Sequence, residues 1–178
     1  MAEIIIRKAV ENDIPRIAGI YDEIHTAEEQ GRITVGWERG IYPTENTARA
    51  AFLRNDLFVI EADGLVVGSA IINDEQPPAY SQVEWSVSCD DSGVLVLHTL
   101  TVSPELSGRG LGKRMVKYYE EMAKEKKNGC LRLDTNEKNT VARKMYKALG
   151  YAEKGMVPCE FNGIDGVFLV CLEKILKN

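Results

Sequence analysis

The spacing of apolar and polar residues changes several times along the chain, and each change marks an expected helix or strand. Apolar residues that recur every three or four positions predict helices over residues 14–30, 44–53, 112–127 and 139–149. Runs rich in β-branched and other apolar residues predict strands over residues 4–8, 57–62, 65–72, 94–102, 130–134, 151–157 and 167–172. Strands and helices in this order indicate an α/β domain with a mixed sheet.

Residues with special backbone preferences support these boundaries. Pro15 is typical of a helix start, and Asn139 can cap the last helix. Asp63-Gly64 between two apolar runs is a strong hairpin signal. Residues 31–43 contain glycines and aromatic residues, and they are expected to form a loop between helices. Because no repeat, low-complexity segment or linker interrupts the pattern, residues 1–178 are predicted to form a single domain.

The composition is that of an ordinary globular protein with an acidic balance. The chain is 44% hydrophobic and 28% charged, with 22 Lys and Arg against 27 Asp and Glu, which gives a net charge of −5. Such a charge does not favour nucleic acid or an anionic membrane as a partner. No apolar run approaches the ~20 residues of a membrane span, and Glu3 is acidic where a signal peptide is positive. The cytoplasm is therefore the predicted location.

Cysteine and histidine usage gives no sign of a metal site. The four cysteines are Cys89, Cys130, Cys159 and Cys171. They form no Cys-x-x-Cys pair and no dense disulfide framework, so all four are expected to be reduced thiols. With only His25 and His98, and no close ligand pair, a zinc site is not expected.

The most informative segment lies between the strand over 94–102 and the helix after it. Residues 107–113, here called the glycine loop, read Ser107-Gly108-Arg109-Gly110-Leu111-Gly112-Lys113. Three alternating glycines at a strand-to-helix turn expose backbone N–H groups, which favour a phosphate or pyrophosphate at the helix N-terminus. A turn that merely needs positive φ angles is the alternative interpretation.

Two common phosphate-binding loops do not match these residues. A P-loop requires Ser or Thr after Gly-Lys, but Arg114 follows Gly112-Lys113. The dinucleotide fingerprint requires a third glycine three residues after the second, where this chain has Lys113 or Met115.

Together with other segments, the glycine loop resembles the GNAT superfamily of N-acetyltransferases. That family has Gln/Arg-x-x-Gly-x-Gly/Ala after a strand ending in Val-x-Pro, and here the loop follows Val102-Ser103-Pro104. Residues 6–13 are similar to the family's first strand and helix. A further signature of Asn, Ala, Tyr and Leu-Gly-Phe resembles Asn139, Ala142, Tyr146, Gly150 and Tyr151. Ser107 departs from the pattern, because the family usually has a long Gln or Arg there.

The resemblance implies a fold, a co-substrate and a set of binding residues. The fold would be a mixed, mostly antiparallel twisted sheet of six to seven strands flanked by helices. Acetyl-CoA would be the co-substrate, with no metal. The residues implied to bind it are Leu100, Thr101, Val102, Ser107, Gly108, Arg109, Gly110, Leu111, Gly112, Lys113, Asn139 and Tyr146.

Direct acetyl transfer to an amine in a ternary complex needs a base and an acid. An amine with a pKa of ~10.4 is almost fully protonated near neutral pH, and the departing thiolate must be protonated. By the resemblance, Tyr146 occupies the position of the acid, although it could instead simply pack in the helix. Asp134, Glu84 and His98 are the candidate bases. Two-residue alternation predicts that His98 shares a face with Leu100 and Val102.

The acceptor pocket is expected to draw on residues 31–43 and 80–85. Their aromatic residues, Trp37, Tyr42, Tyr80 and Trp85, would form apolar walls or belong to the core. The acceptor would be a small-molecule amine or a peptide or protein amine, and the acidic balance favours a cationic one. A homodimer is left open. The alternative function is a non-catalytic acyl-CoA-binding or sensing module of the same fold.

Overall fold

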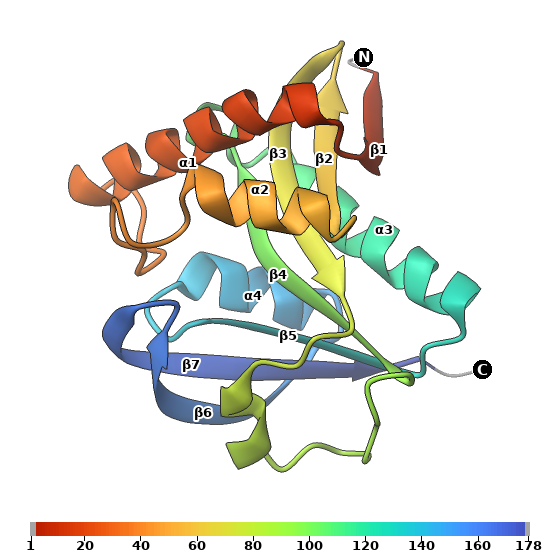
Figure 1. The fold of residues 1–178 in the computed structure, drawn as a ribbon. Coiled ribbons are helices and arrows are strands. Elements are labelled where there is room, and N and C mark those ends of the chain that lie inside the picture. Colours follow the sequence, from red (N-terminus) through yellow and green to blue (C-terminus); the bar gives the residue numbers. More distant parts are fainter. Residues whose placement is uncertain (1–2, 177–178) are drawn as a thin grey trace.

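The computed structural model describes residues 3–176 and contains a seven-stranded sheet with helices on both faces (Figure 1). The strands are β1 (Ile4–Lys8), β2 (Leu57–Ala62), β3 (Leu65–Asn73), β4 (Val94–Val102), β5 (Cys130–Asn136), β6 (Ala152–Phe161) and β7 (Ile164–Ile175). The helices are α1 (Ile14–Glu29), α2 (Glu45–Leu53), α3 (Leu111–Lys126) and α4 (Thr140–Ala148). Short 3-10 helices are η1 (Glu11–Asp13), η2 (Pro78–Gln82) and η3 (Pro104–Leu106).

The strand order is β1-β2-β3-β4-β5-β7-β6. Five of the neighbouring pairs are antiparallel, and β4 with β5 is the parallel pair. This arrangement confirms the predicted mixed, mostly antiparallel sheet. The predicted helices are also present, with ends within about two residues of those expected, as is usual for helix boundaries.

The helices cover the sheet according to their apolar stripes. Buried residues of α1 and α2 pack against β2 and β3 on one face. The apolar stripes of α3 and α4 pack against β4, β5 and β7 on the opposite face, where Met115 and Tyr119 are fully buried. Figure 1 shows α1 and α2 in front of β2 and β3, with α3 on the far side of the sheet. The sheet centre is therefore buried on both faces.

The sheet divides at its middle. Pairing between β4 and β5 ends at Leu97 and Leu133, although β4 continues to Val102 and β5 to Asn136. The β3–β4 register also shifts near this point, where Thr99 has a φ of 49°. Because the extra residue of a bulge bends a strand, β4 turns away from β5 and leaves a wedge between them (Figure 1).

The segment between β3 and β4 corrects the prediction for the cysteines. Cys89 and Cys130 form a disulfide, whereas Cys159 and Cys171 are free. The segment folds back so that its end meets the start of β5, as the pairing of Val94 with Cys130 shows. The two cysteines are 41 residues apart in sequence, so their proximity is a property of the tertiary structure.

None of the helices within residues 3–176 has both the length and the apolar character needed to cross a membrane.

Candidate active site

A cavity of about 580 Å³ occupies the wedge between β4 and β5. This volume is in the range of about 300–1,000 Å³ typical of small-molecule sites. Its walls come from α1, residues 32–42, the second half of β4, the glycine loop, the end of β5, α4 and the β6–β7 hairpin. Elements from the whole length of the chain therefore meet at this one site.

The glycine loop forms one end of the cavity. Gly108 and Gly110 have φ angles of 79° and 76°, which glycine adopts without the strain that a Cβ would bring. Gly110 is the N-cap of α3, and the first backbone bond of the helix joins the Arg114 N–H to the Gly110 carbonyl at 3.1 Å. The amides of residues 111–113 therefore precede the first helical donor, the Arg114 N–H, and have no acceptor within the helix. They form an anion site at the positive end of the helix dipole.

The predicted cofactor residues are nearly all in this part of the cavity. The lining includes Leu100, Thr101, Val102, Ser107, Gly108, Gly110, Leu111, Gly112, Lys113, Asn139 and Tyr146. Arg109 is the exception, because it is exposed and does not line the cavity. From His98 to Val102, β4 has no pairing to β5, so backbone groups on that edge are available to a ligand. Asn139 caps α4 by accepting a bond from the Ala142 N–H at 3.1 Å.

Tyr146 lies on α4 and lines the cavity. Its side chain is buried, with 5% exposure, and its ring makes an edge contact with Tyr151 at 6.0 Å between centroids. Burial and the negative charge of Asp134 raise the pKa of the Tyr146 hydroxyl. The hydroxyl therefore stays protonated at physiological pH and can donate a proton or hydrogen bond.

Asp134 lies on β5 just beyond its last pair with β4, and its side chain lines the cavity. The Tyr80 hydroxyl donates a hydrogen bond of 2.7 Å to Asp134 Oδ2. Burial raises the pKa of Asp134 to about 6, and the bond from Tyr80 opposes that rise. Above this pH the carboxyl is ionised and can accept a proton.

His98 is placed differently from the prediction. The bulge at Thr99 breaks the two-residue alternation, so Leu100 and Val102 pack in the core with α3, whereas His98 pairs with Ile71 on the opposite face. His98 Nε2 lies 2.8 Å from Asn73 Oδ1, and burial lowers the pKa of the imidazole to about 4. His98 does not line the cavity.

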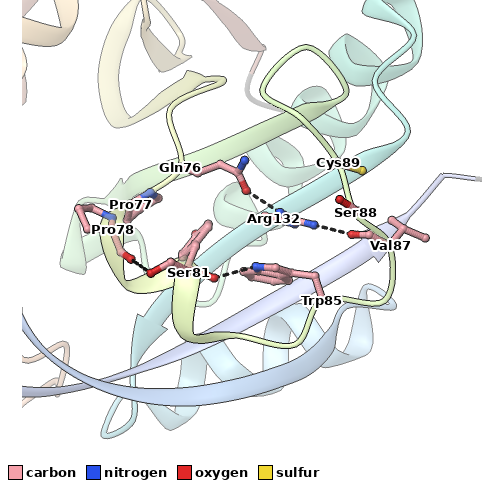
Figure 2. Close-up of a pocket in the computed structure, with 10 residues that line it drawn as sticks. Gln76, Pro77, Pro78, Ser81, Trp85, Val87, Ser88, Cys89 and Arg132 are labelled. Carbon is pink, nitrogen blue, oxygen red and sulfur yellow. Dashed lines mark hydrogen bonds between the residues drawn. The ribbon is translucent and has the colours of Figure 1, made fainter.

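Glu84 and Trp85 are also outside this cavity. Glu84 is exposed, and Trp85 lines a separate surface pocket of about 510 Å³ that lies against Arg132 of β5 (Figure 2). The Arg132 guanidinium lies 4.2 Å from the Trp85 ring, and the Trp85 Nε1–H bonds to the Tyr80 carbonyl at 3.0 Å. Residues 80–85 are expected from the sequence to help form the acceptor pocket. Their contribution is the hydroxyl of Tyr80, which bonds to Asp134.

The other end of the main cavity, here called the acceptor end, surrounds Asp134. It is formed by Val35, Trp37, Tyr42, Asp134, Phe161 and Val167. The Tyr42 ring makes edge contacts with Trp37 at 5.9 Å and with Phe161 at 5.4 Å, and its hydroxyl bonds to Thr99 Oγ1. Sequence reasoning identified Trp37 and Tyr42 but missed Phe161 and Val167. The apolar pattern of the last two strands marked them as strand residues, but it did not show which face bounds a cavity.

The loop that carries Val35 and Trp37 is held by α1. Glu28 Oε2 accepts a hydrogen bond from the Val35 N–H at 2.5 Å, and Oε1 accepts one from the Gly36 N–H at 3.2 Å. A carboxylate that binds backbone amides is a strong anchor. The loop that carries Val35 and Trp37 is therefore fixed in place without a ligand.

Charges are separated along the cavity. The cations in its lining are Arg32 and Lys113, and Asp134 is the one lining carboxylate among residues 3–176. Lys113 belongs to the glycine loop. Arg32 Nη1 lies 3.7 Å from Oε1 of Glu105, a residue of η3, and η3 directly precedes that loop. The same described residues contain no group of three or more His, Cys, Asp and Glu side chains arranged to hold a metal ion.

Known structures share this fold. The chain superposes on a GNAT-family acetyltransferase from Streptococcus agalactiae with a TM-score of 0.81 and 26% identity, covering 98% of this chain and 96% of the other. A putative acetyltransferase from Salmonella typhimurium, solved with acetyl-CoA, shares the fold with a TM-score of 0.68 and 19% identity, covering 98% and 94% of the two chains.

Curated relatives match part of the chain. Aminoglycoside N(6')-acetyltransferase type 1 of Salmonella typhimurium is 30% identical over 98 residues, which are 54% of this chain and 61% of the relative. An uncharacterized N-acetyltransferase of Methanocaldococcus jannaschii is 27% identical over 128 residues, 68% of this chain and 53% of the relative. The matches thus span less than two thirds of these relatives.

The family assignment rests on a longer match. Residues 18–151, well over half of the chain, match the family described as Acetyltransferase (GNAT) family. This range contains the glycine loop, both strands of the wedge, Asp134 and Tyr146. The chain therefore belongs to the GNAT family of acetyltransferases.

Proposed function

We propose that this member of the acetyltransferase family transfers the acetyl group of acetyl-CoA to a primary amine by direct attack in a ternary complex. The observation that carries the proposal is the arrangement of the cavity. The anion site of the glycine loop lies at one end, and Asp134 and Tyr146 line the same cavity beyond the unpaired edge of β4.

The glycine-loop end fits acetyl-CoA. The amides of residues 108–113 would hold the pyrophosphate, and a Cβ built on Gly110 meets no protein atom within 4 Å, which shows open space in front of that backbone. Lys113 adds a positive charge at the same end. Leu100 and Val102 would offer backbone groups to the pantetheine arm. Ser107 removes the side-chain support of a long Gln or Arg, so binding here depends on the backbone donors.

Two side chains of this cavity can move the protons that the transfer requires. Acetyl-CoA supplies an activated thioester carbonyl. Asp134 takes a proton from the ammonium group of the acceptor, and the freed amine forms its bond to the carbonyl carbon as the bond to sulfur breaks. The Tyr146 hydroxyl donates its proton to the departing sulfur. The newly acylated nitrogen then passes its extra proton to the Tyr146 oxygen, and Asp134 releases the first proton to solvent.

The state of the free cysteines favours direct attack by the amine over a mechanism in which a cysteine is acylated first. Burial raises the pKa of the Cys171 thiol to about 12, and burial with the nearby charge of Asp134 raises that of Cys159. The thiolate is the nucleophilic form of cysteine, so both groups are poor nucleophiles near neutral pH. Cys89 and Cys130 are joined to each other.

The proposal is tested by following free thiol while the protein is incubated with acetyl-CoA and a panel of primary amines. We expect amine-dependent thiol release, and initial rates at varied concentrations of both substrates should give intersecting double-reciprocal lines. Parallel lines would indicate a covalent enzyme intermediate and would overturn direct attack. Tight CoA binding with no turnover on any amine would overturn the enzyme proposal and support the non-catalytic acyl-CoA-binding module.

A further inference from the structure

The acceptor end has one negative charge, and its wall combines apolar side chains with the neutral polar side chains of Thr135 and Asn136. Asp134 is the one carboxylate that lines the cavity among the residues the structure describes. Carboxylates of the neighbouring elements, such as Glu28, Glu160 and Asp165, do not line the cavity. Glu28 binds the amides of Val35 and Gly36, whereas Glu160 and Asp165 at the hairpin are exposed and do not line the cavity.

Aromatic rings lie close to this carboxylate. Asp134, Tyr42 and Tyr146 all line the same cavity, and the charge of Asp134 contributes to the raised pKa values of both hydroxyls. Through Tyr42, the rings of Trp37 and Phe161 join the same wall. Val35 and Val167 add aliphatic surface. An ammonium group that pairs with Asp134 thus has its substituent placed against aromatic and aliphatic side chains.

No second carboxylate among residues 3–176 lines this end to pair with a second positive charge. The hydroxyl of Tyr80 already donates to Asp134, and that of Tyr42 is bonded to Thr99. Moving a cation from water to a site without a counter-charge is strongly unfavourable, whereas burial of apolar groups is favourable. The cations Arg32 and Lys113 lie toward the glycine loop, where they suit an anionic co-substrate and repel a polycation.

We propose that the acceptor is a primary amine with a single positive charge and an apolar body, aliphatic or aromatic, and that polyamines and aminoglycosides are poor acceptors. This inference rests on the proposed function and narrows its substrate class. It separates this chain from the relative named as an aminoglycoside acetyltransferase, which shares 30% identity over 98 residues.

A matched pair of amines tests the inference on the unaltered protein. Hexylamine and 1,6-diaminohexane have the same chain length and differ by one terminal ammonium group. We expect kcat/KM for hexylamine to exceed that for the diamine at least about tenfold, because the second charge loses its hydration without a partner. Kanamycin, with several ammonium groups, should be the poorest of the three.

A gain-of-charge variant sharpens the test. Val167→Asp places a second carboxylate at the acceptor end, and it should shift the ratio of kcat/KM values toward the diamine by at least about tenfold. Phe168→Asp is the matched control, because the next residue of β7 is 43% exposed and does not line the cavity. The control should keep the parent ratio. Thermal melting shows whether each variant is folded. If Val167→Asp does not fold, the comparison of hexylamine with 1,6-diaminohexane on the unaltered protein decides the inference.

The possible outcomes distinguish a failure of this inference from a failure of the proposed function. Equal or higher kcat/KM for 1,6-diaminohexane or kanamycin than for hexylamine overturns the inference and leaves amine acetylation intact. An unchanged ratio in a folded Val167→Asp protein also overturns it, because the acceptor would then lie elsewhere. Failure to acetylate any amine overturns the proposed function itself.

Discussion

The two ends of the cavity are built in different ways. The glycine-loop end uses backbone amides of consecutive residues, 107–113, at the start of one helix. The acceptor end uses side chains from residues 35–42, the end of β5 and the β6–β7 hairpin, which together span more than a hundred residues of sequence. One end is thus a local motif, and the other exists only when distant elements pack together. In the proposed function the first end holds the co-substrate, whereas the second holds the acceptor.

Asp134→Asn should have the largest effect, and it acts on the acceptor end alone. The amide keeps the shape of the side chain but cannot take a proton, and a lost general base typically lowers the rate about 10²–10⁴-fold. CoA affinity, measured by calorimetry, should stay near the parent value because the glycine loop is untouched. Activity at the parent level would exclude Asp134 as the base.

Tyr146→Phe removes one hydroxyl between the two ends and keeps the ring that packs against Tyr151. We expect kcat to fall at least about tenfold, since water can partly replace the donor. CoA affinity and melting temperature should change little. If chemistry is rate-limiting and the variant turns over like the parent, Tyr146 is a packing residue only.

Gly110→Val should damage the glycine-loop end. The new Cβ faces the open space in front of the backbone, and its φ of 76° is unfavourable for a β-branched residue by about 1–2 kcal/mol. We expect CoA affinity to fall about tenfold or more while the protein remains folded. Gly64→Val is the matched control, because Gly64 has a φ of 80° and open surroundings in the β2–β3 turn, outside the cavity. Equal CoA affinities in the two variants would place the phosphate elsewhere.

The smallest expected effect is a shift in pH dependence. If Asp134 is the base, as proposed, its carboxylate form is the active one, and kcat/KM should decline as the pH falls through about 6, where burial places its pKa. The groups around Asp134 are Tyr80, Tyr42, Tyr146, Cys159 and Cys171. Their pKa values are all raised, so none of them should titrate in the same range.

Tyr80→Phe tests whether Asp134 causes this decline of kcat/KM at low pH, here called the acid limb. The Tyr80 hydrogen bond favours the charged carboxylate and lowers its pKa, so its loss should move the acid limb to higher pH. Activity on the alkaline side of the limb should stay near the parent value. Trp85→Phe removes the indole N–H bonded to the Tyr80 carbonyl and keeps an aromatic ring, so it should give a smaller shift in the same direction. An acid limb that does not move in Tyr80→Phe would show that another group titrates there.

Much of the fold could be predicted because its signals are local. The hairpin at Asp63-Gly64, the cap at Asn139 and the glycines before α3 depend on the backbone preferences of a few adjacent residues. The place of His98 could not be predicted in the same way. Alternation along a strand holds only while the strand is regular, and the bulge at Thr99 inverts the facing of every residue after it.

The sequence by itself determined the order of helices and strands, the glycine loop and its anion-binding backbone, because these follow from short-range periodicity and steric preference. Tertiary structure alone decided which side chains surround Asp134. Tyr80 reaches Asp134 across 54 residues of sequence, Cys89 meets Cys130 across 41, and Tyr42 packs between Trp37 and Phe161. The physical reason is that burial of apolar surface drives packing without regard to sequence distance, so contacts of this kind leave no local pattern to read.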